Sequence, residues 1–297
     1  MKTRDVFSSY HPIVNFLYFG LVLLFSMCFM HPTCLVISMA SALVYRSRLK
    51  ETKTSMPLRF VVPMAVLAAV LNPVFNHEGA TILAYLPSGN PLTLESMVYG
   101  IASALLLACV IVWFSCYNEV MTSDKFVYLF GRIIPSLSLI LSMTMRFVPR
   151  FSAQLKQVRQ AQACIGRDMS DGRLFDKIRN ALTILSIMIS WSLENAIETA
   201  DSMKSRAYGL PGRTAFSIYS FTERDKYALI WLGFCGVYIV CGWIAGMLRF
   251  DYYPMIKTAV PSAFSVSFMI VYLALCLTPV VLDVLEEKKW KRLQSEI

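Results

Sequence analysis

The chain has 297 residues, of which 56% are hydrophobic and only 16% are charged. Because a soluble domain carries about 25% charged residues, this composition excludes most soluble enzymes and indicates a protein embedded in the lipid bilayer. The formal net charge of +9 is not assigned to nucleic-acid binding, since basic residues on a membrane chain first set its orientation. Eight cysteines lie scattered, mostly inside apolar runs, and indicate neither a disulfide framework nor a metal site.

Six apolar stretches predict helices that cross the membrane, namely 13–30, 32–45, 60–71 with its flanks, 94–117, 227–248 and 261–282. A helix of about 20 residues spans a hydrocarbon core of roughly 30 Å, and the second and third stretches are short by that measure. A further stretch, 126–145, is interrupted by Gly131, Arg132 and Pro135. We predict that it forms a re-entrant or kinked hairpin buried among neighbouring helices, where its backbone groups find partners.

Lysine and arginine are distributed unevenly between the segments that join these stretches. None of the 28 lies in 72–96, whereas 13 lie in 146–226. If both termini are cytoplasmic, 26 of the 28 lie inside and only Arg249 and Lys257 lie outside. Since positive residues favour the cytoplasmic side, we expect cytoplasmic N- and C-termini and six crossings.

The segment 146–226 carries 13 basic and 8 acidic residues, and its apolar residues recur at helical spacing. It predicts two long cytoplasmic helices, the first continuing the membrane helix that starts near Pro135 and the second running from about 174 to 208. The uncharged run 181–193 is too short for a span, so we expect it to lie beneath the membrane. The predicted domains are an N-terminal membrane domain (1–145), a cytoplasmic domain (146–225) and a C-terminal two-span hairpin with a basic tail (226–297).

A similar short pattern ends each cytoplasmic helix: Cys164-Ile165-Gly166 on the first and Ser205-Arg206-Ala207 on the second. Small residues, glycine and a cation are typical of any helix C-terminus, so either pattern alone says little. The pair resembles the twin Ala-Arg-Gly-type signatures that end the coupling helices of the transmembrane T component of energy-coupling factor (ECF) transporters. In that family these tips dock into two ABC-type ATPases.

The resemblance extends to NPVFNHEG at 72–79 and GNPLTLES at 89–96, which are similar to the family's outer-side signature, and to SMTMRFVP at 142–149, where its first coupling helix begins. It implies an all-α polytopic scaffold with about six transmembrane helices, a re-entrant hairpin and two coupling helices. The implied activity is to couple ATP hydrolysis by two ATPases to reorientation of a separate, membrane-embedded substrate-binding S component. The implied setting is vitamin or metal-ion uptake across a bacterial plasma membrane, with no cofactor.

The first tip departs from the family pattern. Where the family usually presents arginine, this chain has Ile165, with Arg167 two positions later, whereas the second tip keeps Arg206. Either Arg167 takes over the contact, or one ATPase contact is apolar, which would suit two non-identical ATPases.

The sequence also predicts roles for two further groups of residues. Asn72, Pro73, His77 and Gly79 are predicted to form a hydrogen-bonded structural loop on the outer side, in preference to a metal site or proton relay. In the run 181–193, Ile187 and Trp191 are expected to contact the S component.

Other functions are less favoured by the sequence. Residues 209–214 (GLPGRT) lack both the lysine and the spacing of a phosphate-binding loop, so the ATPase must be a partner. No set of nucleophile, base and acid residues indicates a membrane-embedded enzyme. A secondary transporter, the other alternative, would be expected to show internal repeats, and none is evident.

Overall fold

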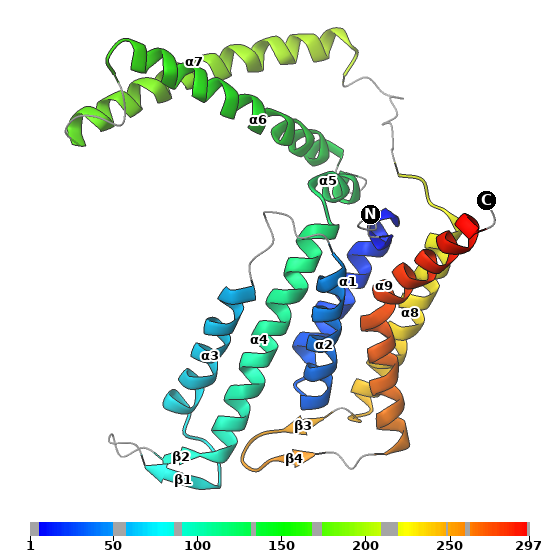
Figure 1. The fold of residues 1–297 in the computed structure, drawn as a ribbon. Coiled ribbons are helices and arrows are strands. Elements are labelled where there is room, and N and C mark those ends of the chain that lie inside the picture. Colours follow the sequence, from blue (N-terminus) through cyan, green and yellow to red (C-terminus); the bar gives the residue numbers. More distant parts are fainter. Residues whose placement is uncertain are drawn as a thin grey trace. The chain divides into compact units, whose positions relative to one another are not determined.

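The computed structural model describes residues 6–49, 58–85, 91–131, 135–167, 174–208, 219–247, 249–258 and 262–295. These residues form long helices with two short strand pairs, which confirms the predicted all-α polytopic fold. The chain divides into two compact units (Figure 1). The membrane unit comprises Met1–Lys125 with Tyr219–Ile297, and the inserted unit comprises Phe126–Ile218.

The membrane unit is a helical bundle. Its elements are η1 (Phe7–Ser9), α1 (Pro12–Cys28), α2 (Pro32–Arg48), α3 (Leu58–Phe75), α4 (Leu94–Val120), α8 (Glu223–Ile244) and α9 (Ala263–Ser295), and α5 (Ser123–Gly131) leads into the inserted unit. Helix α4 packs against α1, α2 and α3, and α9 packs against α2 and α8 (Figure 1). Both α1 and α2 begin with His-Pro, where the histidine Nδ1 accepts an N–H two residues on and proline supplies a preset φ.

Each of the six predicted stretches corresponds to a helix, although these helices differ in their capacity to cross a bilayer. By length and composition, Leu94–Val120, Glu223–Ile244 and Ala263–Ser295 qualify as membrane spans. Pro12–Cys28 and Phe60–Phe75 are shorter apolar helices. The remaining helix, α2, has 17 residues and ends on Arg46 and Arg48.

The core of the bundle contains a cluster of hydrogen-bonded polar side chains. The Ser38 hydroxyl accepts hydrogen bonds from Trp113 Nε1 and Cys109 Sγ, each at 3.0 Å, and lies 2.8 Å from the Ser26 hydroxyl. With both acceptor positions occupied, Ser38 donates to Ser26, which in turn lies 3.1 Å from the Tyr272 hydroxyl. These bonds link α1, α2, α4 and α9, and they satisfy polar groups that would be costly to bury unpaired in a membrane.

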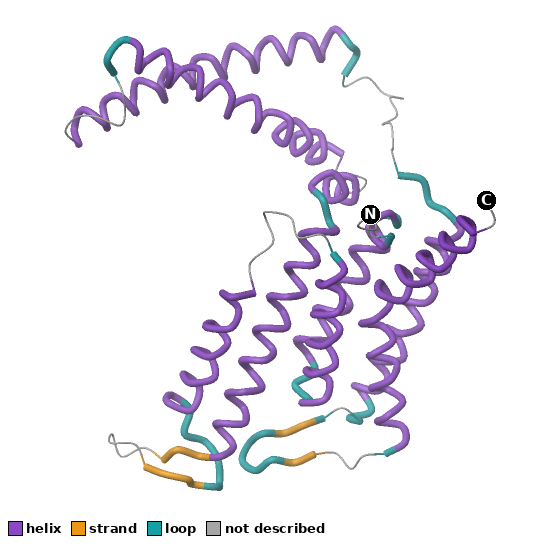
Figure 2. Tube along the Cα trace, viewed as in Figure 1, coloured by secondary structure: helices purple, strands orange, loops and turns teal. Residues whose placement is uncertain are grey.

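The two ends of the bundle differ in charge. At one end lie Lys125, the basic end of α2 and the ion pair between Arg48 and Glu287 at 3.6 Å. At the other end lie the strand pairs β1 (Ile82–Tyr85) with β2 (Pro91–Thr93) and β3 (Phe250–Asp251) with β4 (Lys257–Thr258) (Figure 2). The two pairs are joined where the Ala80 N–H donates to the Pro254 carbonyl at 3.1 Å. The segments that the charge pattern separates thus lie at opposite ends of this unit.

The inserted unit contains two long helices, α6 (Pro135–Cys164) and α7 (Leu174–Ser205), which cross each other (Figure 1). The stretch 126–145, predicted as a hairpin, comprises most of α5 and the beginning of α6, and 132–134 lie outside the described residues. The predicted domain boundaries, 145/146 and 225/226, lie inside α6 and α8. The two compact units instead meet at 125/126 and 218/219. The predicted stop of the second long helix at 209–212 lies outside the described residues.

Candidate functional site

Helix α6 ends in a tight C-terminal cap. The N–H of Gly166 donates to the Ala163 carbonyl and that of Arg167 to the Gln162 carbonyl, both at 3.0 Å. Gly166 has φ +77°, so these bonds form the Schellman arrangement, which favours glycine at the left-handed position. The side chain of Ile165, which lies just before it, is 63% exposed.

Helix α7 ends in the same cap. The N–H of Ala207 donates to the Lys204 carbonyl and that of Tyr208 to the Met203 carbonyl, both at 3.1 Å. Ala207 has φ +61° and is the non-glycine residue with positive φ among those described. A left-handed alanine costs about 1 kcal/mol or more, so this tip carries local strain that the α6 tip avoids.

The equal hydrogen-bond pattern aligns the two tips residue by residue. Ile165 occupies the position of Arg206, Gly166 that of Ala207, and Arg167 that of Tyr208. Arg167 therefore does not stand at the position of the missing arginine, although it is only two residues away along the chain. The tips present an apolar side chain and a guanidinium on otherwise equivalent backbones.

The crossing of α6 and α7 is built around Trp191. Its ring lies edge-on to Phe151 at 5.2 Å between centroids, and the Arg150 guanidinium lies 5.7 Å from the Trp191 ring centre. Ile184, about two helical turns earlier on the same face, is buried. Trp191 thus holds the two helices together, and Ile187, which is 36% exposed, lies on the flank of the same face.

The opposite face of α7 carries large apolar side chains that sequence reasoning did not single out. They recur every three or four residues, and each is more than 50% exposed: Ile178, Leu182, Leu185, Ile189, Leu193 and Ile197. We name this set the α7 stripe. Its helical spacing was readable from the sequence, but the sequence did not show which face α6 covers.

The predicted outer loop is shorter than expected. Asn72 and Pro73 were assigned to the loop, but they lie in the last turn of α3, where the Asn76 N–H donates to the Asn72 carbonyl at 2.8 Å. Pro73 leaves the Ala69 carbonyl without a helical N–H donor. Helix α4 packs closely at this point, since a Cβ on Gly100 would lie 2.8 Å from the Ala69 carbonyl oxygen.

His77 and Gly79 do lie in the loop that follows α3. Gly79 has φ +143°, and a Cβ there would lie 2.6 Å from Glu95 Oε2. The Glu95 carboxylate accepts hydrogen bonds from the backbone and hydroxyl of Thr81, and the Thr93 hydroxyl donates to the Glu78 carbonyl at 2.8 Å. Across the part of the chain that the structure describes, no three His, Cys, Asp or Glu side chains gather as a possible metal site.

The sequence was compared with known protein families. The model of the family described as "Cobalt transport protein" (CbiQ) matches residues 11–216, more than half of the chain. The chain belongs to this family. The matched range includes both helix tips and the outer loop, and the family resemblance predicted from those segments is confirmed.

Individual relatives of this CbiQ-family chain carry the name "Energy-coupling factor transporter transmembrane protein EcfT". The protein from Streptococcus equi subsp. equi (strain 4047) is 29% identical over 106 residues, and that from Lactobacillus helveticus (strain DPC 4571) is 32% identical over 97 residues. These matches cover 35% and 32% of this chain and only 39% and 35% of the relatives. The protein from Bacillus selenitireducens (strain ATCC 700615 / DSM 15326 / MLS10) is 26% identical over 183 residues, 58% of this chain and 68% of the relative.

Proposed function

We propose that this chain is the transmembrane component of an energy-coupling factor transporter. In this role it couples ATP hydrolysis by two ABC-type ATPase subunits to reorientation of a membrane-embedded S component, and it catalyses no reaction itself. Family membership and the relatives' names support the proposal. The cargo would be a vitamin or a metal ion, taken up across a bacterial plasma membrane.

The observation that carries this proposal is the geometry of the crossed helices. Cys164 follows Phe151 by 13 residues, and Ser205 follows Trp191 by 14. At about 1.5 Å per residue, each tip lies roughly 20 Å from the crossing. Two arms of nearly equal length that end in equivalent exposed caps suit a pair of similar subunits, one on each tip.

The orientation of the chain is part of the proposal. The basic end of the bundle, which carries both connections to the inserted unit, would face the cytoplasm, as positive residues favour that side. Both termini and the α6–α7 pair would then be cytoplasmic, within reach of soluble ATPases.

The α7 stripe supplies a surface for the S component. Six large apolar side chains along one helix face are unusual on a cytoplasmic surface and favour contact with an apolar partner. The predicted contact of Ile187 and Trp191 with the S component stays a prediction, and the α7 stripe adds a surface on the other side of the helix.

The test is purification of the tagged full chain from its native membrane in mild detergent, with identification of the proteins that accompany it. We expect two ATP-binding cassette proteins and one small membrane protein. Leu185→Asp should release the membrane protein and retain the ATPases, whereas Ser190→Asp, an equal charge change at an exposed position off the stripe, should retain both. Purification of the chain without ATPases would contradict the proposed function.

A further inference from the structure

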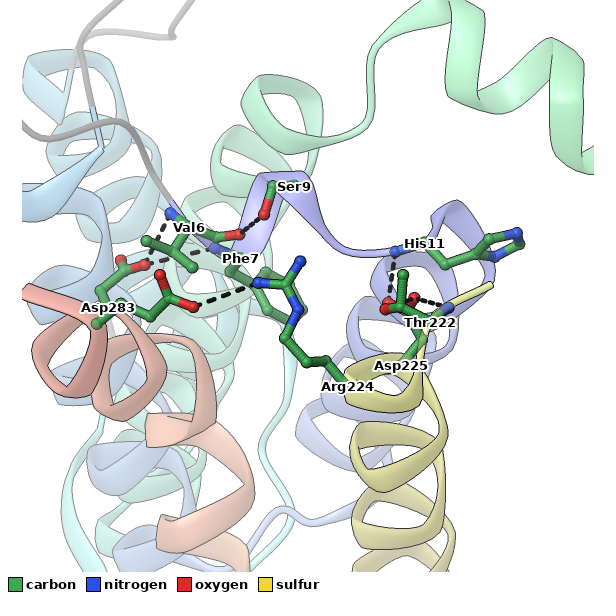
Figure 3. Close-up of polar contacts among 9 residues, drawn as sticks. Val6, Phe7, Ser9, His11, Thr222, Arg224, Asp225 and Asp283 are labelled. Carbon is green, nitrogen blue, oxygen red and sulfur yellow. Dashed lines mark hydrogen bonds and ion pairs between the residues drawn. The ribbon is translucent and has the colours of Figure 1, made fainter. Parts of the chain in front are cut away.

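The N-terminal segment Val6–His11 is held by charged side chains from three other parts of the membrane unit. These side chains are Lys125 in α5, Asp225 in α8 and Asp283 in α9 (Figure 3 shows the two aspartates). They are 6%, 3% and 8% exposed, respectively. Charged groups are rarely buried so completely unless their partners are fixed.

Asp283 holds the start of the segment. One of its carboxylate oxygens accepts the N–H of Val6 at 3.0 Å and that of Phe7 at 3.4 Å (Figure 3). The Phe7 ring is only 1% exposed and packs edge-on against Tyr18 at 5.0 Å between centroids. The segment is therefore fixed by both a polar and an apolar contact, and it is not a loose tail at this point.

Asp225 holds the end of the segment and joins it to α8. Its Oδ1 accepts the His11 N–H at 2.9 Å, while its Oδ2 accepts the N–H and the hydroxyl of Thr222 at 2.8 and 2.6 Å (Figure 3). The bond from the Thr222 N–H belongs to the capping box of α8. One carboxylate thus serves both as a helix cap and as a tie to the N-terminal segment.

Lys125 holds the middle of the segment and joins it to the end of α4. Its Nζ donates to the Ser8 carbonyl at 2.6 Å and to the Val120 carbonyl at 2.9 Å. Charge-assisted bonds of this kind are stronger than those between neutral groups.

These ties lie at both chain connections of the inserted unit. Lys125 is the last residue before Phe126–Ile218, and Tyr219 is the first after it. The ring of His11 lies edge-on to Phe221 at 5.2 Å, which adds a contact on the second connection. One six-residue segment therefore contacts the chain on either side of an insertion of 93 residues.

We propose that Val6–His11 is a strap that fixes Lys125 and 221–225, the described residues of the membrane unit on either side of the inserted unit, to the membrane helices. Movement that reaches Lys125 or 221–225 is then passed to α1, α4, α8 and α9 together. The mechanical role rests on the proposed function, whereas the strap itself rests on the contacts above.

The first test is hydrogen exchange of the purified full chain in detergent. Lys125→Met removes the donors and keeps the length of the side chain. We expect amide exchange in 120–125 and 222–226 to rise about tenfold or more, because buried bonds at both connections are lost or loosened. Lys226→Met is the control, since Lys226 pairs only on the surface with Glu223 at 2.6 Å. Equal exchange in the wild type and Lys125→Met would overturn the strap.

Asp283→Asn is the second variant, for use if Lys125→Met does not accumulate in the membrane. Asparagine keeps the shape of the aspartate side chain. Here too, faster exchange at 120–125, which lies far from Asp283 in sequence, is the expected result. Exchange that changed only around Asp283 would overturn the strap, because it would show that the three ties act separately.

The second test measures transmission, with spin labels on the native exposed cysteines Cys28 and Cys164 and with Cys241 replaced by serine. In Lys125→Met the distribution of label distances should broaden, and any change on addition of ATP to the complex with its ATPases should shrink. A distribution of label distances in Lys125→Met that is as narrow as in the wild type would contradict the strap. If no ATPase binds to the wild type, the proposed function fails. The amide exchange and the width of the distance distribution still test whether Val6–His11 acts as a strap.

Discussion

A single side chain distinguishes two helix tips that share one backbone geometry. Ile165 and Arg206 hold the same place in equivalent caps. An arginine can pair with an acidic groove and complement the helix dipole. An isoleucine can contribute only by burying its apolar surface against a partner. We therefore expect two partner surfaces of different chemistry, one apolar and one acidic.

The first prediction concerns the charged tip. Arg206→Glu should lower the amount of ATPase that co-purifies with the chain by about tenfold or more, because it places like charges at the contact. Ile165→Ala should have a smaller effect, since it removes only part of an apolar contact. The ratio of ATPase to tagged chain on a gel is the measurement. Arg167→Glu is the matched control, and a loss in this variant as large as in Arg206→Glu would show that Arg167 carries the first contact.

A second prediction concerns the backbone of the tips. Ala207→Gly should stabilise the end of α7 by about 1 kcal/mol, since glycine adopts φ +61° without strain. Gly166→Ala should destabilise the end of α6 by a similar amount, because no atom lies within 4 Å of the added Cβ and only the backbone conformation is unfavourable. Amide exchange at Tyr208 and Arg167 measures both effects. Slower exchange at Arg167 in Gly166→Ala would contradict the assignment.

At the scale of elements, α8 and α9 approach each other closely at Gly242. A Cβ on Gly242 would lie 2.5 Å from the ring of Phe268. Gly246, four residues on, has φ +72° and ends α8. The Gly-x-x-x-Gly spacing therefore combines one packing glycine with one helix-ending glycine.

The third prediction follows from this contact. Gly242→Ala should destabilise the bundle by about 1–3 kcal/mol, because the ring of Phe268 must move within a packed interface. Gly233→Ala is the matched control: it lies in the same helix with no atom within 4 Å of its Cβ, and it should be neutral or slightly stabilising. Thermal unfolding in detergent measures both. Equal melting temperatures for the two variants would show that α8 and α9 do not need this approach.

At the scale of the whole molecule, the asymmetric charge predicts a topology that native cysteines can report. Cys164 at the α6 tip and Cys28 at the end of α1 are both exposed. In sealed vesicles of known orientation, with Cys241 replaced by serine, a membrane-impermeant maleimide should label Cys164 only from the cytoplasmic side. Cys28 should react only from the outside. Labelling of Cys164 from the outside would overturn the orientation and the access of ATPases with it.

The sequence by itself determined the helices, their apolar character, the separation of basic segments and the family. These properties depend on neighbouring residues, since a helix closes its hydrogen bonds within four residues and hydropathy is a property of each run. The tip signatures could be read for the same reason. Asn72 and Pro73 were misplaced because a proline in the last turn of a helix and a proline in a loop give the same local pattern.

The tertiary structure alone decided which faces are covered and which distant residues meet. Trp191 could be called an exposed contact from its own helix, and only the position of α6 shows that its ring is packed. The contact of Lys125 with Ser8 joins residues 117 positions apart, and that of Val6 with Asp283 joins residues 277 apart. No local pattern encodes such pairs, because a buried charge is indistinguishable in sequence from a solvated one until the chain segments that satisfy it have packed together.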